Sequence, residues 1–388
     1  MTMRVGFLLN HYNVHQVPHI VPYAFELSRI VGDIETDILT STRAEEEFAR
    51  EIGRGYKDHK CTFQPLNVPF SAKLLDPLLS KFVFARKHAV LRANADRLCR
   101  FDALVVPEMT SFALRKMPGF ENVKLIFTGH GAGDNRLGGS FNRRIGDFDL
   151  ALLPGRKYAD DLKEVGYLSP DNYAISGYPK FEAVKHTGVV RRRFFDNDRP
   201  TVVYNPHHAR PLTSWHKMGR DILDFFYAND TYNLIFSPHV LLFERSWSHG
   251  GRLPAKYKSE NGVLIDKGSH FSADMTYLKS ADLYLGDVSS QVYEFLEEPR
   301  PCVFLNAHKF DWQNDPSYRH WKLGPLIDNV SMLEQALAEA AKNHIRYEEI
   351  QRSSFAYTFK TSRQTAGVRG ATIIADFLKK GRIEAKWQ

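Results

Sequence analysis

The chain has 388 residues, of which 43% are hydrophobic, so it can bury two cores and is too long for one ordinary core. Its formal net charge of +7 suits an anionic partner such as a nucleotide, a phospholipid surface or a nucleic acid, without choosing among them. Three widely spaced cysteines, with no CxxC or Cys/His ligand spacing, argue against a disulfide framework and a structural zinc site.

The N-terminus reads MTMRVGFLLNHYN, one basic residue followed by a short β-like run. It lacks the longer apolar core and the small-residue cleavage site of a signal peptide. No apolar run reaches the ~20 residues that a membrane-spanning helix needs. We therefore expect a cytoplasmic protein.

The first half of the chain alternates short β-like runs with helical segments. Thr42 and Glu45 form a capping box that predicts a helix over Arg43–Ile52, and a long helical stretch covers Asp76–Cys99. Strands alternating with helices are typical of βα units and a parallel sheet. The predicted strands are Arg4–Asn10, Glu35–Thr40, Cys61–Leu66, Ala103–Val106, Val123–Thr128, Leu150–Leu153 and Tyr173–Ser176.

A polar, arginine-rich stretch at Val189–Pro200 interrupts this pattern and predicts a linker. The alternation then restarts, and a last amphipathic segment covers Val368–Lys380. The predicted strands of the second half are Thr201–Asn205, Leu234–Ser237, Val263–Asp266, Leu283–Leu285 and Cys302–Leu305. The predicted helices are Ser214–Tyr227, Asp274–Ser280, Ser290–Glu297 and Ser331–Asn343.

Two α/β halves of similar size predict two Rossmann-like domains that face each other across a cleft. We expect an N-terminal domain over residues 1–188 and a C-terminal domain over 200–366. For the helical segment 367–388, a return to the N-terminal domain is one interpretation. Ligands of such sheets bind beyond the carboxyl ends of the strands, so polar clusters after strands are the candidate sites. No GxGxxG follows the first strand, so the dinucleotide fingerprint is absent.

The stretch FTGHGAGD places His130 where a predicted strand ends. Flanking glycines such as Gly131 let the backbone approach a ligand and expose its N–H groups, and an imidazole there can act as a general base. Asp134 either orients the imidazole or caps the next helix, and capping is the favoured role. A tight turn with a capping histidine is the alternative interpretation of the whole cluster.

Two histidine-containing loops follow strands of the second half. Asn205 and Arg210 lie in YNPHHARP, which suits a phosphate or a base edge as well as it suits an exposed proline-rich loop. His239 lies in FSPHV, where it can hold a phosphoryl oxygen or protonate a leaving group, or else cap a helix.

The strongest anion signal is the run LGDVSSQVYEF, in which Asp287 follows a strand and Ser289 and Ser290 open a helix. Serine hydroxyls and N–H groups at a helix N-terminus form a phosphate site. Ordinary capping uses the same atoms, so both interpretations stand together.

In the first loop His11, His15 and His19 fall four residues apart. Pro18 and Pro22 predict a loop there, so a substrate-contacting loop is favoured over a metal-binding helix face. The stretch 71–101 mixes basic and apolar residues as an amphipathic helix does, which predicts a solvated basic face, with peripheral contact to an anionic membrane as the second interpretation. Basic residues are spread along the chain without a nucleic-acid motif, so nucleic acid is not an expected partner.

Five motifs in this order resemble the CDP-glycerol glycerophosphotransferase family, the polymerases and primases of wall teichoic acid and capsule. The resemblance covers residues 123–297. The chain departs from the family's pattern at Gly129, which precedes the histidine, and in the order Pro238-His239. The motifs are Thr128-Gly-His130-Gly, Gly177-Tyr-Pro179-Lys180, Tyr204-Asn-Pro206, Ser237-Pro-His239 and Asp287-Val-Ser289-Ser290.

The resemblance implies a GT-B fold and a metal-independent transferase with a CDP-linked, nucleotide-activated donor and no cofactor. Its acceptor would be a hydroxyl of a glycan or lipid-linked glycan at the inner face of the cytoplasmic membrane. It also implies that His130 is the catalytic base and that His239 holds the donor phosphate. Together with the residue patterns, it gives the predicted substrate-binding residues Gly131, Asn205, Arg210, Asp287, Ser289 and Ser290.

Two other classes of function remain open from the sequence. One is a GT-B glycosyltransferase or a nucleotide-sugar 2-epimerase, which shares the fold but acts at carbon. The other is a non-catalytic protein that binds a nucleotide or a phospho-glycan.

Overall fold

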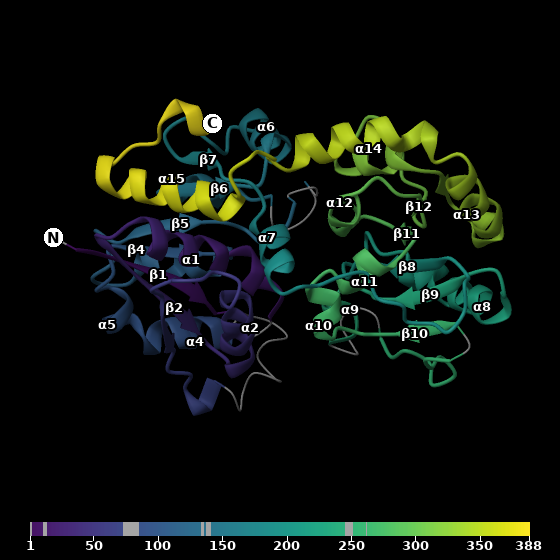
Figure 1. Ribbon diagram of the computed structural model, residues 1–388, viewed down its shortest axis with the longest axis horizontal. Helices are drawn as coiled ribbons and strands as arrows, with labels where there is room; N and C mark the ends of the chain where they lie inside the picture. Colours follow the sequence, from purple (N-terminus) through teal and green to yellow (C-terminus); the bar gives the residue numbers. More distant parts are fainter. Residues whose placement is uncertain are drawn as a thin grey trace. The chain divides into compact units, whose positions relative to one another are not determined.

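Each half of the chain builds its own parallel sheet flanked by helices (Figure 1). The computed structural model describes residues 2–10, 14–72, 85–132, 136, 141–244, 251–260 and 262–388. These fall in two compact units: the first contains the described residues of 2–132, 141–188 and 357–388, and the second contains 136 and those of 189–356. The α/β class predicted from the sequence is confirmed.

The first unit contains a seven-stranded sheet with the order β3-β2-β1-β4-β5-β6-β7. Along β1, Val5, Phe7 and Leu9 belong to one buried apolar cluster, and Leu8 belongs to another. Alternation along one strand puts these side chains on opposite faces, so both faces of the sheet are covered. The strands are β1 (Met3–Leu9), β2 (Ile34–Thr40), β3 (Thr62–Pro65), β4 (Ala103–Val106), β5 (Lys124–Phe127), β6 (Leu150–Leu153) and β7 (Tyr173–Ile175).

The helical segments of the first unit are mostly short. The capping box at α2 is present as predicted: Thr42 accepts from the Glu45 N–H, and the Glu45 side chain accepts from the Thr42 N–H. The segments are η1 (Val14–His19), α1 (Val21–Ile30), α2 (Arg43–Gly53), α4 (Ala85–Ala93), α5 (Ala95–Leu98), η2 (Met109–Lys116), η3 (Arg143–Asp147), α6 (Arg156–Glu164), α7 (Pro179–His186), α15 (Ala366–Lys380) and η7 (Ala385–Trp387).

The second unit contains a six-stranded sheet with the order β10-β9-β8-β11-β12-β13. The strands are β8 (Thr201–Asn205), β9 (Asn233–Phe236), β10 (Val263–Ile265), β11 (Leu283–Gly286), β12 (Cys302–Leu305) and β13 (Leu326–Ile327). The helical segments are η4 (Trp215–Gly219, a π-helical turn), α8 (Arg220–Ala228), α9 (Leu241–Glu244), α10 (His270–Ala273), α11 (Thr276–Ser280), α12 (Gln291–Phe295), η5 (Pro316–Leu323), η6 (Val330–Met332), α13 (Leu333–Lys342) and α14 (Ile345–Thr358).

One local expectation, that for the first loop, needs correction. Pro18 and Pro22 do not keep the first loop irregular: Pro18 lies inside the 3-10 helix η1, and Pro22 lies in the first turn of α1, where a missing N–H costs nothing. The strand β13 and the helix α14 were not predicted from the sequence. Of the predicted helix over 76–99, residues 76–84 lie outside the described residues.

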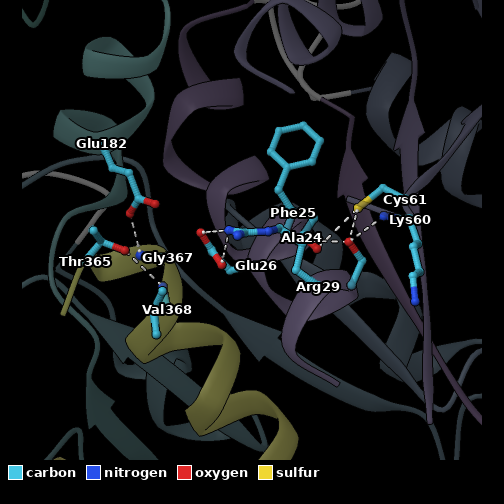
Figure 2. Close-up of polar contacts among 11 residues, drawn as sticks. Ala24, Phe25, Glu26, Arg29, Lys60, Cys61, Glu182, Thr365, Gly367 and Val368 are labelled. Carbon is cyan, nitrogen blue, oxygen red and sulfur yellow. Dashed lines mark hydrogen bonds and ion pairs between the residues drawn. The ribbon is translucent and has the colours of Figure 1, made fainter. Parts of the chain in front are cut away.

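The last helix, α15, packs beside α1 in the first unit (Figure 1). Its N-terminus is capped by Thr365, whose Oγ1 accepts from the Val368 N–H at 3.3 Å, and by Glu182 of α7, whose Oε2 accepts from the Gly367 N–H at 2.8 Å (Figure 2). Carboxylates stabilise helix N-termini because the N–H groups there lack partners within the helix.

Arg369 connects α15 to the turn after β7. Its guanidinium donates to the Ser176, Gln364 and Lys360 carbonyls at 2.9, 2.7 and 2.8 Å. Gly177 sits under it with φ of +92°, and a Cβ there would lie 2.0 Å from the guanidinium. The glycine of the Gly177-Tyr-Pro-Lys180 motif is therefore required by the backbone angle and by this close approach.

None of the described helices combines the length and the apolar composition that a membrane crossing requires.

We expect Arg369→Met to loosen α15, because three backbone carbonyls, of which that of Ser176 is buried, lose a charged donor. Hydrogen exchange of the α15 amides, followed by mass spectrometry, should accelerate roughly 10- to 100-fold. Lys379→Met is the matched control on the same helix: Lys379 pairs with Asp33 at an exposed position, so exchange should change by about twofold or less. Unchanged exchange in the Arg369 variant would contradict this account of the helix.

Candidate active site

His130 lies just beyond the carboxyl end of β5, as the sequence predicted for its motif. Gly129 turns the chain there with φ of +66°, a left-handed angle that favours glycine. This turn brings the imidazole against the end of the neighbouring strand β4, where His130 Nδ1 is 2.8 Å from the carbonyl oxygen of Pro107.

The contact with Pro107 decides where the imidazole carries its proton. A carbonyl oxygen only accepts, so Nδ1 is the protonated nitrogen, and in the neutral ring Nε2 then carries the lone pair. The amide nitrogen of Gln16 also lies 3.4 Å from Nδ1.

The surroundings of His130 keep its ring neutral. As a residue it is accessible to solvent, yet the protein around the ring desolvates it, which lowers its pKa. The Pro107 carbonyl and the nearby Glu108 carboxylate oppose this shift, while the Lys87 ammonium adds to it. A neutral imidazole with its lone pair on Nε2 is the form required of a general base.

An ion pair that the sequence did not predict lies next to this histidine. Lys87 of α4 and Glu108, after β4, form a salt bridge in which the side chains are only 2% and 5% exposed. Thr110 Oγ1 donates to Glu108 Oε1 at 2.5 Å, and Asn10, at the end of β1, donates to the Lys87 carbonyl at 3.1 Å. The expectation that Lys87 belongs to a solvated basic face is therefore wrong.

The histidines of the first loop gather around His130. Their η1 helix places the ring centroid of His15 5.6 Å from that of His130 and the centroid of His19 6.5 Å from it. His19 also meets Tyr178, from the N-terminus of α7, at 5.1 Å. A loop expected to contact substrate is thus part of the same cluster, while His11 lies outside the described residues.

His19 is buried, 5% exposed, in a positive environment. Burial lowers its pKa well below the usual value, and Lys180, His130 and His15 lower it further. It therefore stays neutral in the folded protein well below the pH at which it gains a proton in the unfolded chain.

In the second unit, Asp287 holds two loops together at the carboxyl edge of the sheet. Its Oδ1 accepts from the N–H groups of His207 and Val288 at 2.9 and 2.7 Å. Its Oδ2 accepts from the N–H and the hydroxyl of Ser214 at 2.6 and 2.8 Å. The side chain is 1% exposed and its oxygens are occupied by protein donors, so Asp287 orders the loop instead of presenting its carboxylate to a ligand.

Asn205 and Ser289 form a second buried link beside it. Ser289 Oγ donates to Asn205 Oδ1 at 2.8 Å, and Asn205 Nδ2 donates to the Ser237 carbonyl at 2.6 Å. Both side chains are buried: Ser289 is 7% exposed and Asn205 is 1% exposed. Ser290, at the start of α12, is half-buried, and its side chain forms no capping hydrogen bond.

Three histidines form a cluster in the loops that follow β8 and β9. The rings of His207 and His208 stack with centroids 4.4 Å apart, and His208 lies 4.2 Å from His239. His239 Nδ1 accepts from the Leu241 N–H at 3.2 Å, and His207 Nδ1 accepts from the Ala209 N–H at 2.9 Å. Each neutral ring then carries its proton on Nε2 and is a hydrogen-bond donor there.

The remaining predicted site residues are less defined by contacts. Arg210 is exposed in the loop after β8, and Gly131 follows His130 in a bend. Asp134 lies outside the described residues. Among the residues that the structure describes, no three His, Cys, Asp or Glu side chains are arranged to hold a metal ion.

Sequence reasoning overlooked Pro107, Glu108 and Gln16. The sequence did contain a signal for Pro107 and Glu108. The polar segment PEMT directly follows the predicted strand over 103–106, just as the selected motifs directly follow other predicted strands. Gln16 gave no such signal, since it lies in a proline-containing loop whose helical structure was not predicted.

Comparison with solved structures shows the GT-B fold. The wall teichoic acid polymerase TagF matches with a TM-score of 0.61 and 15% identity over 97% of this chain and 89% of that one. S. aureus MnaA in complex with UDP matches with a TM-score of 0.60 and 15% identity over 98% and 97%. A UDP-N-acetylglucosamine 2-epimerase matches with a TM-score of 0.60 and 14% identity over 99% and 97%.

No protein-family model matches the chain, and a search of curated proteins finds no relative. One of these neighbours is named for UDP-N-acetylglucosamine, MnaA was solved with UDP, and a variant of TagF was solved after a soak with CDPG. At this level of identity the likeness establishes the fold.

We expect the stability of the first unit to depend on pH through His19. Its folded pKa lies below its unfolded pKa, so the unfolded state binds the proton first and stability falls as the pH drops below about 6.5. In His19→Gln, the loss of unfolding free energy between about pH 7.5 and about pH 5.5 should be smaller by roughly 1 kcal/mol. Urea unfolding followed by circular dichroism measures this.

Above about pH 7.5 His19 is neutral in both the folded and the unfolded state. The plots of unfolding free energy against pH for the wild-type and variant proteins should therefore run parallel there. Equal slopes at acidic pH would contradict the assignment.

We expect Asp287→Asn to destabilise the second unit by about 2–4 kcal/mol, because an amide nitrogen would face donors that the carboxylate now accepts. Urea unfolding followed by tryptophan fluorescence detects the change, since Trp321 donates to the Asp287 carbonyl. Asp311→Asn, at an exposed position, should change stability by no more than about 0.5 kcal/mol. Equal stability of the two variants would exclude the loop-ordering role.

Proposed function

We propose that the protein transfers a glycerophosphate-type group from a CDP-linked donor to a hydroxyl group of a glycan or lipid-linked glycan in the synthesis of a cell-surface polymer. The observation that carries the proposal is the 2.8 Å contact between His130 Nδ1 and the Pro107 carbonyl oxygen, from which we infer that Nδ1 is protonated and that Nε2 is the basic nitrogen. The five motifs that resemble the CDP-glycerol glycerophosphotransferase family and the structural likeness to TagF support the choice of donor.

In the proposed reaction, His130 Nε2 takes the proton of the acceptor hydroxyl as its oxygen attacks the phosphorus that bears glycerol. The bond between that oxygen and phosphorus forms, and the bond from phosphorus to the oxygen of CMP breaks. CMP leaves with the electron pair. The charge that moves onto it must be met by hydrogen-bond donors, because no proton accompanies it.

The histidine loops of the second unit are suited to that task. His239 and His207 carry Nε2–H donors, as their Nδ1 atoms accept from backbone N–H groups. Arg210 and Ser290 are further donors of the same unit that we assign to the diphosphate. Asn205, Asp287 and Ser289 hold this loop framework in place through their buried hydrogen bonds.

A nucleotide-sugar 2-epimerase is the second candidate. The 2-epimerase and MnaA–UDP structures are covered to 97% of their length, against 89% for TagF. Incubation with UDP-N-acetylglucosamine and product analysis distinguishes the two, since epimerisation leaves the nucleotide attached and transfer releases CMP. Calorimetric binding of CMP with no turnover of any donor would instead indicate a non-catalytic binding protein.

We expect His130→Ala to lower the rate of CMP release from CDP-glycerol by roughly 10²- to 10⁴-fold, because the general base is lost. In the wild-type enzyme, kcat/KM should fall only at pH values below about 6.5, since the pKa of His130 is lowered. His344→Gln, at the start of α14, is the control and should leave the rate unchanged. Unchanged CMP release in His130→Ala would remove this residue from the mechanism.

A further inference from the structure

A buried ion pair adjoins His130, and the reaction as proposed gives it no role. Glu108 is the residue after Pro107, and the Pro107 carbonyl oxygen accepts from the His130 Nδ1–H. The backbone nitrogen of Glu108 is therefore bonded to the carbonyl group that orients the imidazole. Lys87 reaches the same carboxylate from α4, and the side chains are 2% and 5% exposed.

Stability alone does not account for such a pair. Removing two charges from water costs several kcal/mol, and apolar residues of similar volume are often at least as stable in their place. The carboxylate is also held at both oxygens, by Lys87 at Oε2 and by Thr110 at Oε1. A charge that is buried and fixed in this way acts strongly on neighbouring groups that gain or lose a proton.

We propose that Glu108 is a positioning residue that stabilises the imidazolium formed on His130 during proton transfer, while Lys87 fixes its carboxylate and limits its effect. The proposal rests on the proposed function, because general-base catalysis is what makes His130 cationic. When Nε2 takes the hydroxyl proton, the ring becomes positive where the protein around it already disfavours a positive charge by desolvation. The nearby carboxylate offsets that charge without itself being protonated.

The other charged and titratable groups around His130 do not supply this negative charge. His15 and His19 face it from η1, and Lys180 acts on His19. The side chains of His15, His19 and Lys180 are either neutral or positive. Among the described groups that we identify around the His130 ring, Glu108 is therefore the one that carries a negative charge.

The test uses two substitutions with opposite expected effects on the full-length protein. Glu108→Gln removes the negative charge, while the amide still accepts from Lys87 and can meet the Thr110 hydroxyl. Lys87→Met removes the positive charge and keeps the length of the side chain. Titration of His130 by NMR, which needs no substrate, should show a lower pKa in Glu108→Gln and a higher pKa in Lys87→Met.

Turnover gives the second measurement. In Glu108→Gln, kcat for CMP release should fall roughly 10- to 100-fold with KM within about twofold, as expected when an interaction acts mainly in the transition state. Asp149→Asn is the matched control, because it neutralises the carboxylate of another ion pair in the same unit, that with Arg115. It should change neither the titration of His130 nor kcat.

Either single variant leaves one buried charge without its partner and is at risk of unfolding. The double variant Lys87→Met/Glu108→Gln carries neither charge and is expected to fold, with kcat still reduced roughly 10-fold or more.

Shifts of the His130 pKa in the same direction in both single variants, or no shift, would overturn the inference. Opposite shifts with kcat unchanged in Glu108→Gln would also overturn it, while leaving the proposed function intact. Absence of CMP release by the wild-type protein would overturn the proposed function, and the catalytic role of Glu108 with it, whatever the titration shows.

Discussion

The hydrogen bond from His130 Nδ1 to the Pro107 carbonyl is the interaction on which the arrangement of the candidate site in the first unit depends. It exists because β4 and β5 are parallel neighbours in register, with Val106 opposite Phe127, so the residues that follow them leave the sheet at one edge. The left-handed turn at Gly129 then directs the imidazole back toward β4. Orientation and tautomer follow together, because a carbonyl oxygen accepts only from a protonated nitrogen.

Backbone groups impose the opposite tautomer in the second unit. His239 and His207 accept backbone N–H groups at Nδ1, so their protons lie on Nε2. The same type of side chain therefore carries its proton on Nδ1 in His130 of the first unit and on Nε2 in His207 and His239 of the second. The loops that create these contacts are tied by Asp287 and Asn205, which explains why these polar residues are buried.

Much of the fold was predictable, because short apolar runs alternate with longer amphipathic segments and the histidines follow strands. The predictions that failed concern residues whose environment is determined by tertiary contacts. Lys87 looks like its basic neighbours in the sequence, and only its contact with Glu108 distinguishes it. The sequence likewise does not separate a polar residue that binds a ligand from one that holds a loop, since both present the same atoms. The helix α14 buries few of its residues, so its apolar pattern is weak.

The two leading reactions make different demands on His130, and its environment bears on them. A pKa lowered by desolvation makes the imidazole a weaker base. Such a base suffices for a hydroxyl, whose proton becomes more acidic as its oxygen bonds to phosphorus. Removing a proton from carbon, as an enzyme acting at that atom requires, calls for a stronger base, since carbon acids are weaker. The lowering of the His130 pKa by desolvation is therefore an argument for the proposed transfer to a hydroxyl, and the Pro107 carbonyl, which raises that pKa, acts in the opposite direction.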